Sequence, residues 1–511
     1  MPIEERLFNL AIDAVEVIVL LFVFALWCGA VWLVYLYVAD RFQTKQAIRR
    51  NYPIIGRFRY FFEHMGTFFR PYFFAMDREE LPFNRADRSW VYRAAKNVER
   101  TIAFGSTRSL TPVGEVIFLN SLFPILDSKA HFHEDVVIGD GYVPTPYKPH
   151  SLFNISGMSY GALSKPAVLA LGHGAKQANV WMNTGEGGVS SYHIRSGCDL
   201  VVQIGTAKYG VRDEQGKLSE EKLKRLAKLE QVRMFEIKLS QGAKPGKGGV
   251  LPGEKVTAEI AEIRGIPEGE DSISPNAHEE IQSISDLLDM VNRIRQCTGK
   301  PVGFKLVLGD YSWLDEFCQE ILKRGIHTAP DFITLDSADG GTGAAPQTLM
   351  DYVGLPLQRS LPVLVDTLHE YGLKGRIKVI CSGKLITPAA VAWALCMGAD
   401  FIVSARGFMF SIGCIQALQC NKNTCPTGVT THDPKLQRGL DWQDKSKRVA
   451  QYVVNMQKEL EMLAHSCGVK SPRQLTRKHA HIIVDPRTTL PMDELYPQAK
   501  VKEELIRVIE T

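Results

Sequence analysis

The sequence has little net charge, and its few cysteines follow no disulfide framework. Across 511 residues, 60 lysine and arginine side chains face 56 aspartate and glutamate side chains, a formal net charge of +4. So small a surplus gives no indication of nucleic-acid binding. Most of the ten cysteines are scattered, as is usual for free thiols in a reducing compartment, so we expect the main body of the chain in the cytosol. The scattered ones are Cys28, Cys198, Cys297, Cys318, Cys381, Cys396 and Cys467.

Two common nucleotide-binding motifs are absent. No Gly-x-Gly-x-x-Gly opens a helix, because Gly341-Thr342-Gly343 runs into Pro346 and Gly172-His173-Gly174 has no third glycine. Gly246-Lys247 is followed by Gly248, where a phosphate-binding loop requires serine or threonine. No internal repeat or low-complexity tract is present either. These absences disfavour a doubly wound dinucleotide-binding sheet, the main alternative to the fold predicted below.

One apolar run stands apart from the rest of the chain. Val17 to Ala39 is uncharged over 23 residues, long enough to cross a hydrocarbon core of ~30 Å as a helix. We interpret residues 1–40 as an N-terminal membrane anchor. A cleaved signal peptide is the main alternative, but Asp13 and Glu16 precede the run where a signal would be basic. A buried core helix is a further alternative.

The charges that flank this run predict its orientation. Arg41, Lys45, Arg49 and Arg50 follow it, whereas only Arg6 precedes it. Basic residues stay on the cytoplasmic side of a membrane helix. We therefore expect a single-pass protein of the inner (cytoplasmic) membrane, with everything after residue 40 in the cytoplasm.

From residue 151 onward, short β-rich apolar runs alternate with helical patterns, which is typical of parallel βα units. The count of eight matches a (β/α)8 TIM barrel, an α/β fold in which chemistry lies on the loops that follow the strands. We expect an adaptor segment over 41–150, the barrel over 151–435 and a C-terminal helical extension over 436–511. The predicted strands are Ser151–Ile155, Val180–Asn183, Leu200–Ile204, Met234–Leu239, Val302–Leu308, Phe332–Asp336, Ile377–Cys381 and Phe401–Ser404.

Three further segments have a readable character. The charged run Ser219 to Glu230 predicts an exposed helix, and Val449 to Ala464 predicts a helix packed on the outside of the barrel. Gln241 to about Lys300 is a long insertion between the fourth and fifth strands, rich in proline and glycine. Loops of such length inside a compact fold are usually functional, so we expect it to cover the site.

The predicted loops after the seventh and eighth strands suit a phosphate group. Gly383 with Lys384, and Ala405 with Arg406, combine small residues that let main-chain N–H groups approach closely with basic side chains. This indicates a phosphorylated cofactor such as FMN. Lys238 and Lys305 lie on strands at positions that face the barrel interior, and Lys244 follows on the next loop. Together the three lysines predict a cationic pocket suited to a carboxylate substrate.

Cys414-x5-Cys420-x4-Cys425-Pro426 gathers the remaining cysteines on one short segment. Three thiolates so close together can hold an iron-sulfur cluster. Zinc completed by a distant fourth ligand is an alternative, although its cysteines usually come as closely spaced pairs. Three ordinary buried cysteines are the other alternative.

Several motifs together resemble the synthase domain of glutamate synthase. The resemblance runs in order from about Ser151 to about Thr431, and we identify a membrane-anchored form of the FMN-binding glutamate synthase family that lacks the glutaminase half. That half would need an N-terminal cysteine, and this chain begins Met1-Pro2-Ile3. The motifs are Phe235-Glu236-Ile237-Lys238, Gln241-Gly242-Ala243-Lys244-Pro245-Gly246, Gly248-Gly249, Leu251-Pro252-Gly253, Ile273-Ser274-Pro275, Lys305-Leu306-Val307, Asp339-Gly340-Gly341-Thr342-Gly343-Ala344 and the cysteine segment.

The resemblance implies an iron-sulfur flavoprotein oxidoreductase acting on CH-NH2 donors. It implies FMN and a [3Fe-4S] cluster on Cys414, Cys420 and Cys425, and reduction of 2-iminoglutarate, formed from 2-oxoglutarate and ammonia, to L-glutamate. Residue by residue, it implies Lys305, Glu186 and Lys244 as catalytic and Lys238, Lys244, Arg264 and Ser159 as substrate-binding. The implied cofactor residues are Gly157, Met158, Ser159, Gln203, Lys305, Gly341, Thr342, Gly343, Gly383, Lys384, Ala405 and Arg406.

Two positions depart from the family pattern. Val250 stands where the family has glutamine, and Lys208 where it has arginine. The loss of one polar contact changes recognition by about 1–3 kcal/mol, so a small amine in place of ammonia is conceivable. Expected partners are an electron donor such as ferredoxin, the membrane and further copies of the chain in a homo-oligomer.

Two other functions compete with this interpretation. One is a membrane-associated FMN and iron-sulfur electron-transfer or scaffold subunit that forms no glutamate. The other is an FMN 2-hydroxyacid oxidase, which is disfavoured because no histidine base lies at a matching strand end.

Overall fold

The computed structural model describes residues 3–73, 76–98, 101–126 and 135–502. Contacts divide the chain into two compact units, residues 1–76 and residues 77–511. The division comes after Met76, whereas the sequence suggested boundaries at residue 40, after the membrane anchor, and at residue 150, after the adaptor. As a result, α4 (Arg85–Lys96), which lies in the predicted adaptor, belongs to the larger unit.

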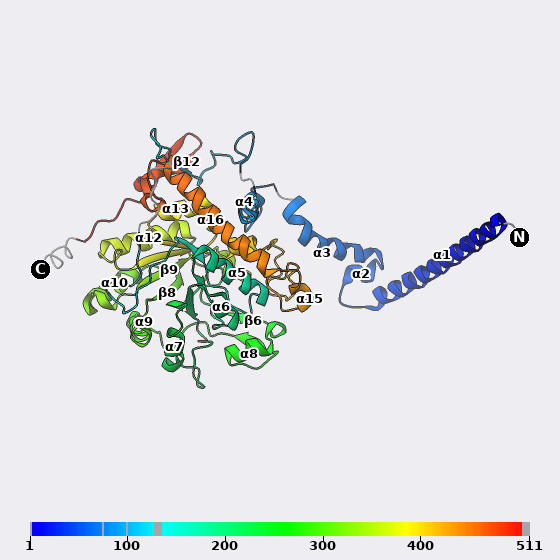
Figure 1. Ribbon diagram of the computed structural model, residues 1–511, viewed down its shortest axis with the longest axis horizontal. Helices are drawn as coiled ribbons and strands as arrows, with labels where there is room; N and C mark the ends of the chain where they lie inside the picture. The colour runs from blue at the N-terminus through cyan, green and yellow to red at the C-terminus, as the bar shows by residue number, and fades with distance from the viewer. Residues whose placement is uncertain (1–2, 74–75, 99–100, 127–134, 503–511) are drawn as a thin grey trace. The chain divides into compact units, whose positions relative to one another are not determined.

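The larger unit is built around a closed barrel of eight parallel strands, in the order β10-β11-β2-β3-β4-β5-β8-β9 (Figure 1). This confirms the predicted α/β barrel. All eight predicted strands are present, with ends that differ by at most two residues. They are β2 (Phe153–Ile155), β3 (Met182–Asn183), β4 (Leu200–Ile204), β5 (Val232–Lys238), β8 (Val302–Val307), β9 (Phe332–Asp336), β10 (Lys378–Ser382) and β11 (Phe401–Ser404).

Helices follow the strands and cover the barrel from outside, as βα units require. The strands are almost wholly buried because one face meets these helices and the other fills the barrel, where several strands also carry polar side chains such as Glu236 and Lys305. A separate apolar cluster that includes Trp181, Met234, Phe332 and Phe401 fills the barrel interior. The covering helices are α5 (Lys165–Ala178), α6 (Ser191–Ser196), α7 (Glu220–Ala227), α9 (Ile284–Thr298), α10 (Trp313–Arg324), α12 (Leu357–Glu370), α13 (Pro388–Cys396) and α14 (Arg406–Ser411).

The long insertion after β5 is shorter than predicted. Its last part, from Ile284, is α9, the ordinary barrel helix of this βα unit, which is capped by Ser283. The insertion proper contains the hairpin of β6 (Val250–Leu251) and β7 (Ser272–Ile273), with α8 (Ala258–Arg264) between the two strands. The exposed helix predicted over Ser219 to Glu230 is α7, which begins after its cap Ser219.

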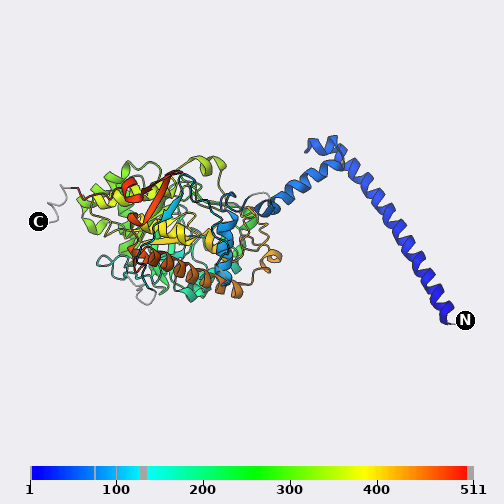
Figure 2. The ribbon, with the colours of Figure 1, turned by 90° about the horizontal axis from the view of Figure 1, so that it is seen from above.

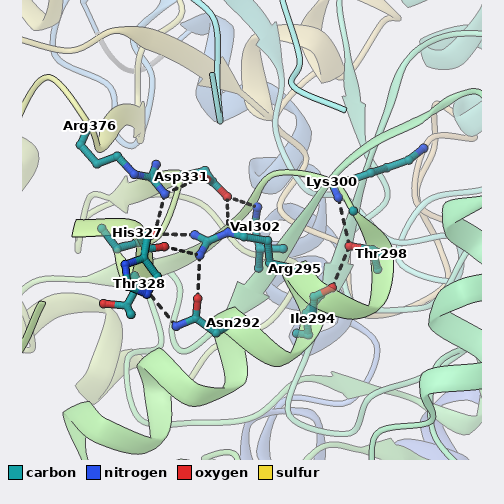
Figure 3. Close-up of polar contacts among 12 residues, drawn as sticks. Asn292, Ile294, Arg295, Thr298, Lys300, Val302, His327, Thr328, Asp331 and Arg376 are labelled. Atoms are coloured by element: carbon teal, nitrogen blue, oxygen red, sulfur yellow. Dashed lines mark hydrogen bonds and ion pairs between the residues drawn. The ribbon is translucent and has the colours of Figure 1, made fainter. Parts of the chain in front are cut away.

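A buried ionic network closes the end of the barrel where the strands begin. Asp331, just before β9, is fully buried and pairs with Arg295 Nε at 3.1 Å and Arg376 Nη2 at 2.8 Å. Its carboxylate also accepts the main-chain N–H of Val302 at 2.8 Å. Figure 3 shows the two guanidinium groups converging on this carboxylate. Polar groups at this end of a barrel serve stability, so the network joins α9, β8 and β9 rather than forming a reaction site.

The C-terminal part adds a long helix and a small sheet. α16 (Trp442–Ser466) includes the predicted helix over 449–464 and packs against α5, α4 and α13 (Figure 1). The expected helical extension also contains two strands, β12 (Ala480–Asp485) and β13 (Thr488–Pro491), which form an antiparallel sheet with β1 (Val116–Phe118). The partner of β12 in this sheet, β1, lies more than 300 residues earlier, so local sequence did not reveal the pairing.

Within residues 3–73, the smaller unit has three helices. α1 (Ile3–Phe42) is one long helix, followed by α2 (Ala47–Asn51) and α3 (Ile55–Phe73) (Figure 2). Phe8–Phe42 within α1 is long and apolar enough to cross a membrane. Its most apolar stretch of 18 residues has a mean hydropathy of 2.8, and none of that stretch is buried.

Candidate active site

Loops at the carboxyl ends of the barrel strands surround two cavities. The smaller has a volume of about 140 Å³ and the larger about 760 Å³. Both are lined by Lys244, Val250, Gly341–Gly343, Arg406 and Cys420. This is the end of a (β/α)8 barrel where reactions take place. Most of the predicted site residues are therefore gathered at one end of the barrel, whereas Lys305 and Gly383 line neither cavity.

Glu186 and Lys238 form an ion pair in the smaller cavity. Glu186 follows β3 and Lys238 ends β5, and their Oε2 and Nζ atoms lie 2.9 Å apart. Burial raises the pKa of Glu186, but the charges of Lys238, Lys244 and Arg264 outweigh it and hold that pKa below its ordinary value. Glu186 is therefore a carboxylate at neutral pH, placed among three cations.

The insertion supplies the other two cations. Lys244 follows β5 directly and Arg264 ends α8, and both side chains are buried and line the smaller cavity. Burial lowers the pKa of Lys244 to about 8, and repulsion from Lys238 makes a smaller contribution in the same direction. Arg264 donates from Nη1 to Ser272 Oγ at 3.0 Å, whereas its buried Nε finds no hydrogen-bond partner in the described part of the chain. A buried N–H without a partner is costly unless a ligand accepts from it, so these cations suit an anion.

Lys305 lies deeper in the barrel. Its Nζ is 3.0 Å from Asp336 Oδ2, across the neighbouring strands β8 and β9. Burial lowers the pKa of Lys305, but Asp336 and Glu236 reverse this effect, and the pKa lies above its ordinary value. Glu236 is held by Asn183 Nδ2 at 2.8 Å and Gln203 Nε2 at 2.7 Å. Lys305 is thus a permanent buried cation with two acidic neighbours.

Two glycines allow close packing in and around the site. A β-carbon on Gly157 would lie 2.9 Å from both Asn183 Oδ1 and Gln203 Nε2. Gly383 has φ +120°, and a β-carbon there would lie 2.3 Å from that of Ser337. A larger residue at Gly157 would displace Asn183 and Gln203, and one at Gly383 would clash with Ser337, so both positions favour glycine.

Basic side chains lie at the ends of β10 and β11, as predicted. Arg406 lines both cavities and donates from Nη2 to the carbonyl of Thr342, and Lys384 lines the larger cavity. Lys384 Nζ is 2.8 Å from Asp339 Oδ2, and its main chain is left-handed, with φ +54°. Such strain in a non-glycine residue is often found at functional sites. Gly383 is not among the residues that line either cavity.

The three clustered cysteines line the larger cavity together. Burial raises the pKa of Cys414 to about 11, and the charges of Cys420 and Cys425 act on it, so the three thiols lie near one another. Burial also raises the pKa of Cys425, but hydrogen bonds from Thr427 and Thr430 bring it below its ordinary value. Among the described residues, no three His, Cys, Asp or Glu side chains are arranged around a single metal ion.

The family model described as "Conserved region in glutamate synthase" matches residues 121–470 of this chain. The chain belongs to the glutamate synthase family. This confirms the resemblance carried by the motifs between Ser151 and Thr431. The match extends beyond them at both ends, and it includes the barrel and all of α16.

Relatives in the family span different shares of this chain. The "Glutamate synthase large subunit-like protein YerD" of Bacillus subtilis (strain 168) is 39% identical over 91% of this chain and 95% of its own length. The "Archaeal glutamate synthase (NADPH)" of Methanocaldococcus jannaschii is 35% identical over 63% of this chain and 60% of its own length. The "Archaeal-type glutamate synthase (NADPH)" of Thermotoga maritima is 30% identical over 72% of this chain and 70% of its own length.

Solved structures show a weaker similarity to this chain than these relatives do. A mandelate oxidase variant with a monooxide FMN adduct has 15% identity and a TM-score of 0.41, covering 76% of this chain and 91% of its own. A flavocytochrome b2 variant with pyruvate bound has 14% identity and a TM-score of 0.44, covering 80% of this chain and 86% of its own.

Sequence reasoning missed two groups of this site. Asp336 was identified only as the end of a strand, although an acidic residue at the carboxyl end of a barrel strand is a signal in itself. Lys255 was overlooked because it lies within the insertion, far in sequence from the residues it contacts. Its side chain is buried, and Nζ donates to the carbonyls of Ala162 at 2.9 Å and Cys420 at 3.3 Å.

Proposed function

We propose that this chain is an FMN-dependent, iron-sulfur glutamate synthase-like oxidoreductase that reductively aminates 2-oxoglutarate to L-glutamate. The observation that carries the proposal is the convergence of Glu186, Lys238, Lys244 and Arg264 on one cavity that Gly157 to Ser159 and Arg406 also line. Three cations and one carboxylate suit a substrate that has two carboxylates and a carbonyl or imine that must receive a proton. Membership of the glutamate synthase family supports this choice of substrate.

The residues fit a flavin phosphate cofactor. Gly157, Met158, Ser159 and Gln203 line the smaller cavity where the ring would lie, and the close-packed Gly157 leaves a flat, side-chain-free wall. The phosphate of the cofactor would lie beside Gly341–Gly343, Lys384, Ala405 and Arg406. Lys305 would face the ring as a fixed positive charge, since Asp336 and Glu236 keep it protonated. Bound FMN would supply a hydride to the imine carbon of 2-iminoglutarate.

The chain's own side chains would orient the oxoacid. Lys244 and Arg264 would bind carboxylate oxygens, and the unpartnered Nε of Arg264 gives this a physical reason. Lys238 Nζ, hydrogen-bonded to Gln241 Oε1 at 2.5 Å and paired with Glu186, would deliver or stabilise a proton near the reacting carbon. Ser159, which follows β2 and lies next to Gly187, would add a further contact to the oxoacid.

The three cysteines fit a cluster better than a single ion. They line a common cavity of about 760 Å³, and their sulfur atoms are the ligands that soft iron prefers. A [3Fe-4S] cluster spreads its iron atoms apart and would use one thiolate from each cysteine. The cluster would pass electrons from a donor such as ferredoxin to the flavin.

Membrane attachment is the second part of the proposal. α1 provides an apolar helix of sufficient length, and the basic residues that follow it favour a cytoplasmic barrel at the inner membrane. Fractionation of cells that produce the full chain tests this part: extraction from membranes by alkali or salt would contradict a spanning helix.

An anaerobic assay tests the chemistry. The purified protein, given 2-oxoglutarate, ammonium and reduced ferredoxin or dye, should form L-glutamate and show flavin and iron-sulfur absorbance. Val250 lines both cavities, so methylammonium and ethylammonium belong in the same assay. Bound cofactors with no amino acid formed from any amine would favour the electron-transfer subunit instead.

A further inference from the structure

The last helix of the smaller unit, α3, carries a continuous aromatic face. At about 100° per residue, Ile55, Phe58, Phe61, Phe62, Met65, Phe69, Tyr72 and Phe73 fall within an arc of roughly 120°. Arg57, Tyr60 and His64 lie outside this arc. The helix is therefore amphipathic, with an apolar side made almost wholly of aromatic rings.

This aromatic face is exposed although α2 packs against the same helix. The phenyl rings of Phe58, Phe61, Phe62 and Phe73 are between 55% and 71% exposed. Contiguous exposed aromatic surface of this kind is rare on a soluble protein and marks an interaction site. The face therefore requires a partner with an apolar surface.

The turn between α1 and α3 is fixed by one buried carboxylate. Asp40, near the end of α1, is fully buried and accepts hydrogen bonds from Arg49 Nε at 2.9 Å, Arg57 Nε at 2.7 Å and the N–H of Ile54 at 3.0 Å. Arg57 belongs to the first turn of α3. The first turn of α3 is thus joined directly to the end of the apolar helix, which places α3 where that helix leaves a membrane.

The charges around the turn match an anionic lipid surface. Between residues 41 and 64 there are six arginines and lysines and one acidic residue, Glu63. Two of the six are engaged by Asp40, whereas Arg41, Lys45, Arg50 and Arg59 are exposed. Each basic side chain close to an anionic leaflet adds to the attraction between the chain and the lipid surface. Aromatic rings at the level of lipid headgroups and basic side chains beside them are typical of helices that lie in the membrane surface.

We propose that α3 lies in the plane of the membrane, with its aromatic face in the headgroup region of an anionic leaflet. This inference rests on the proposed membrane attachment through α1 and assigns a second, interfacial contact to the chain. A second copy of the chain or the barrel of the same chain could instead cover the face, and these occupants are outcomes of the test below.

Site-specific fluorescence on the full-length protein tests the proposal. An environment-sensitive fluorescent amino acid replaces Phe62, on the aromatic face, or Tyr60, on the opposite side, as the matched control. The protein is reconstituted in vesicles of phosphatidylcholine with one quarter phosphatidylglycerol that contain a lipid nitroxide at a shallow position. We expect the Phe62 probe to be quenched at least about threefold more strongly than the Tyr60 probe. Replacement of the phosphatidylglycerol by phosphatidylcholine should weaken this quenching.

A third probe separates this proposal from membrane attachment itself. The fluorescent residue in place of Val31, within α1, should be quenched by lipids that carry the nitroxide deep in the acyl chain. Quenching at Val31 with equal or no quenching at Phe62 and Tyr60 would overturn the surface orientation of α3 and favour a protein partner. Absence of quenching at all three positions would overturn both the anchor and this inference.

Discussion

Lys255 Nζ donates a hydrogen bond to the main-chain carbonyl of Cys420 across 3.3 Å. The lysine belongs to the insertion that carries Arg264, whereas the cysteine belongs to the candidate cluster segment more than 150 residues later. A second hydrogen bond joins the same two segments, because Asn423 Nδ2 donates to the carbonyl of Glu254 at 3.2 Å. The segments proposed to bind the oxoacid and the cluster are therefore joined by direct hydrogen bonds.

Lys255→Met should weaken both segments at once. The buried methionine would leave two carbonyl groups without their donor, at about 1–3 kcal/mol each, and would remove a positive charge near the cysteines. We expect a lower iron content and a raised KM for 2-oxoglutarate, measured on the same preparation. Lys224→Met, on the exposed side of α7, is the control. If iron content and KM both equal those of the control, the hydrogen bonds of Lys255 do not contribute to either function.

Cys420→Ser should remove the cluster and leave much of the flavin. Serine oxygen is a poor ligand for this soft iron, whereas the residues proposed to hold FMN lie on other loops. Iron and FMN content of anaerobically purified protein give the result. Cys467→Ser, which alters a buried cysteine outside the segment, should change neither. Full iron content in the Cys420 variant would refute the proposed ligand.

The affinity for 2-oxoglutarate should fall as pH rises through about 8. Burial and Lys238 lower the pKa of Lys244 to about 8, so its ammonium is charged below that pH and neutral above it. Only the charged form attracts a carboxylate. KM for 2-oxoglutarate should therefore rise above pH 8, and Lys244→Arg should shift this rise to higher pH because arginine stays charged. Lys244→Met should raise KM by about 10–100-fold at pH 7, the scale of one charged hydrogen bond, and should remove the pH dependence.

Glu186→Gln should reduce kcat without weakening oxoacid binding. The amide keeps the shape of the side chain but cannot accept a proton beside Lys238, and loss of positioned acid–base chemistry lowers rates by about 10²–10⁴. KM for 2-oxoglutarate should stay equal or fall, because three cations lose their only carboxylate neighbour in that cavity wall. Steady-state kinetics measure both, with the exposed Glu262→Gln as control. A raised KM at unchanged kcat would assign Glu186 to binding.

Asp331→Asn should destabilise the barrel without touching the reaction. It leaves the buried guanidinium groups of Arg295 and Arg376 without their counter-charge, which typically lowers the free energy of unfolding by about 3–5 kcal/mol. Urea titration followed by fluorescence measures the loss. Asp289→Asn, at an exposed pair with Arg324, should change stability by less than about 1 kcal/mol. Equal stability of the two variants would show that the network at the base contributes little.

The barrel could be predicted because its signals are local. Each strand is an apolar run such as Phe332–Asp336 that ends at small or polar residues, and each boundary depends on a few neighbours in sequence. The α9 boundary was misjudged because Pro275 and the glycines before it suggested a loop, whereas the cap at Ser283 begins a helix. The pairing of β1 with β12 gave no local signal, since strand partners are selected by tertiary packing.

The amino-acid sequence alone determined the barrel, the apolar N-terminal helix, the spacing of Cys414, Cys420 and Cys425, and the family, because residue type and order are sufficient for each. Only the tertiary structure decided which charges meet. Glu186 with Lys238, Lys305 with Asp336 and Asp40 with Arg57 are contacts between segments that folding brings together. The physical reason is that a charge in a protein interior is stabilised by its neighbours in space, and separation along the chain does not reveal those neighbours.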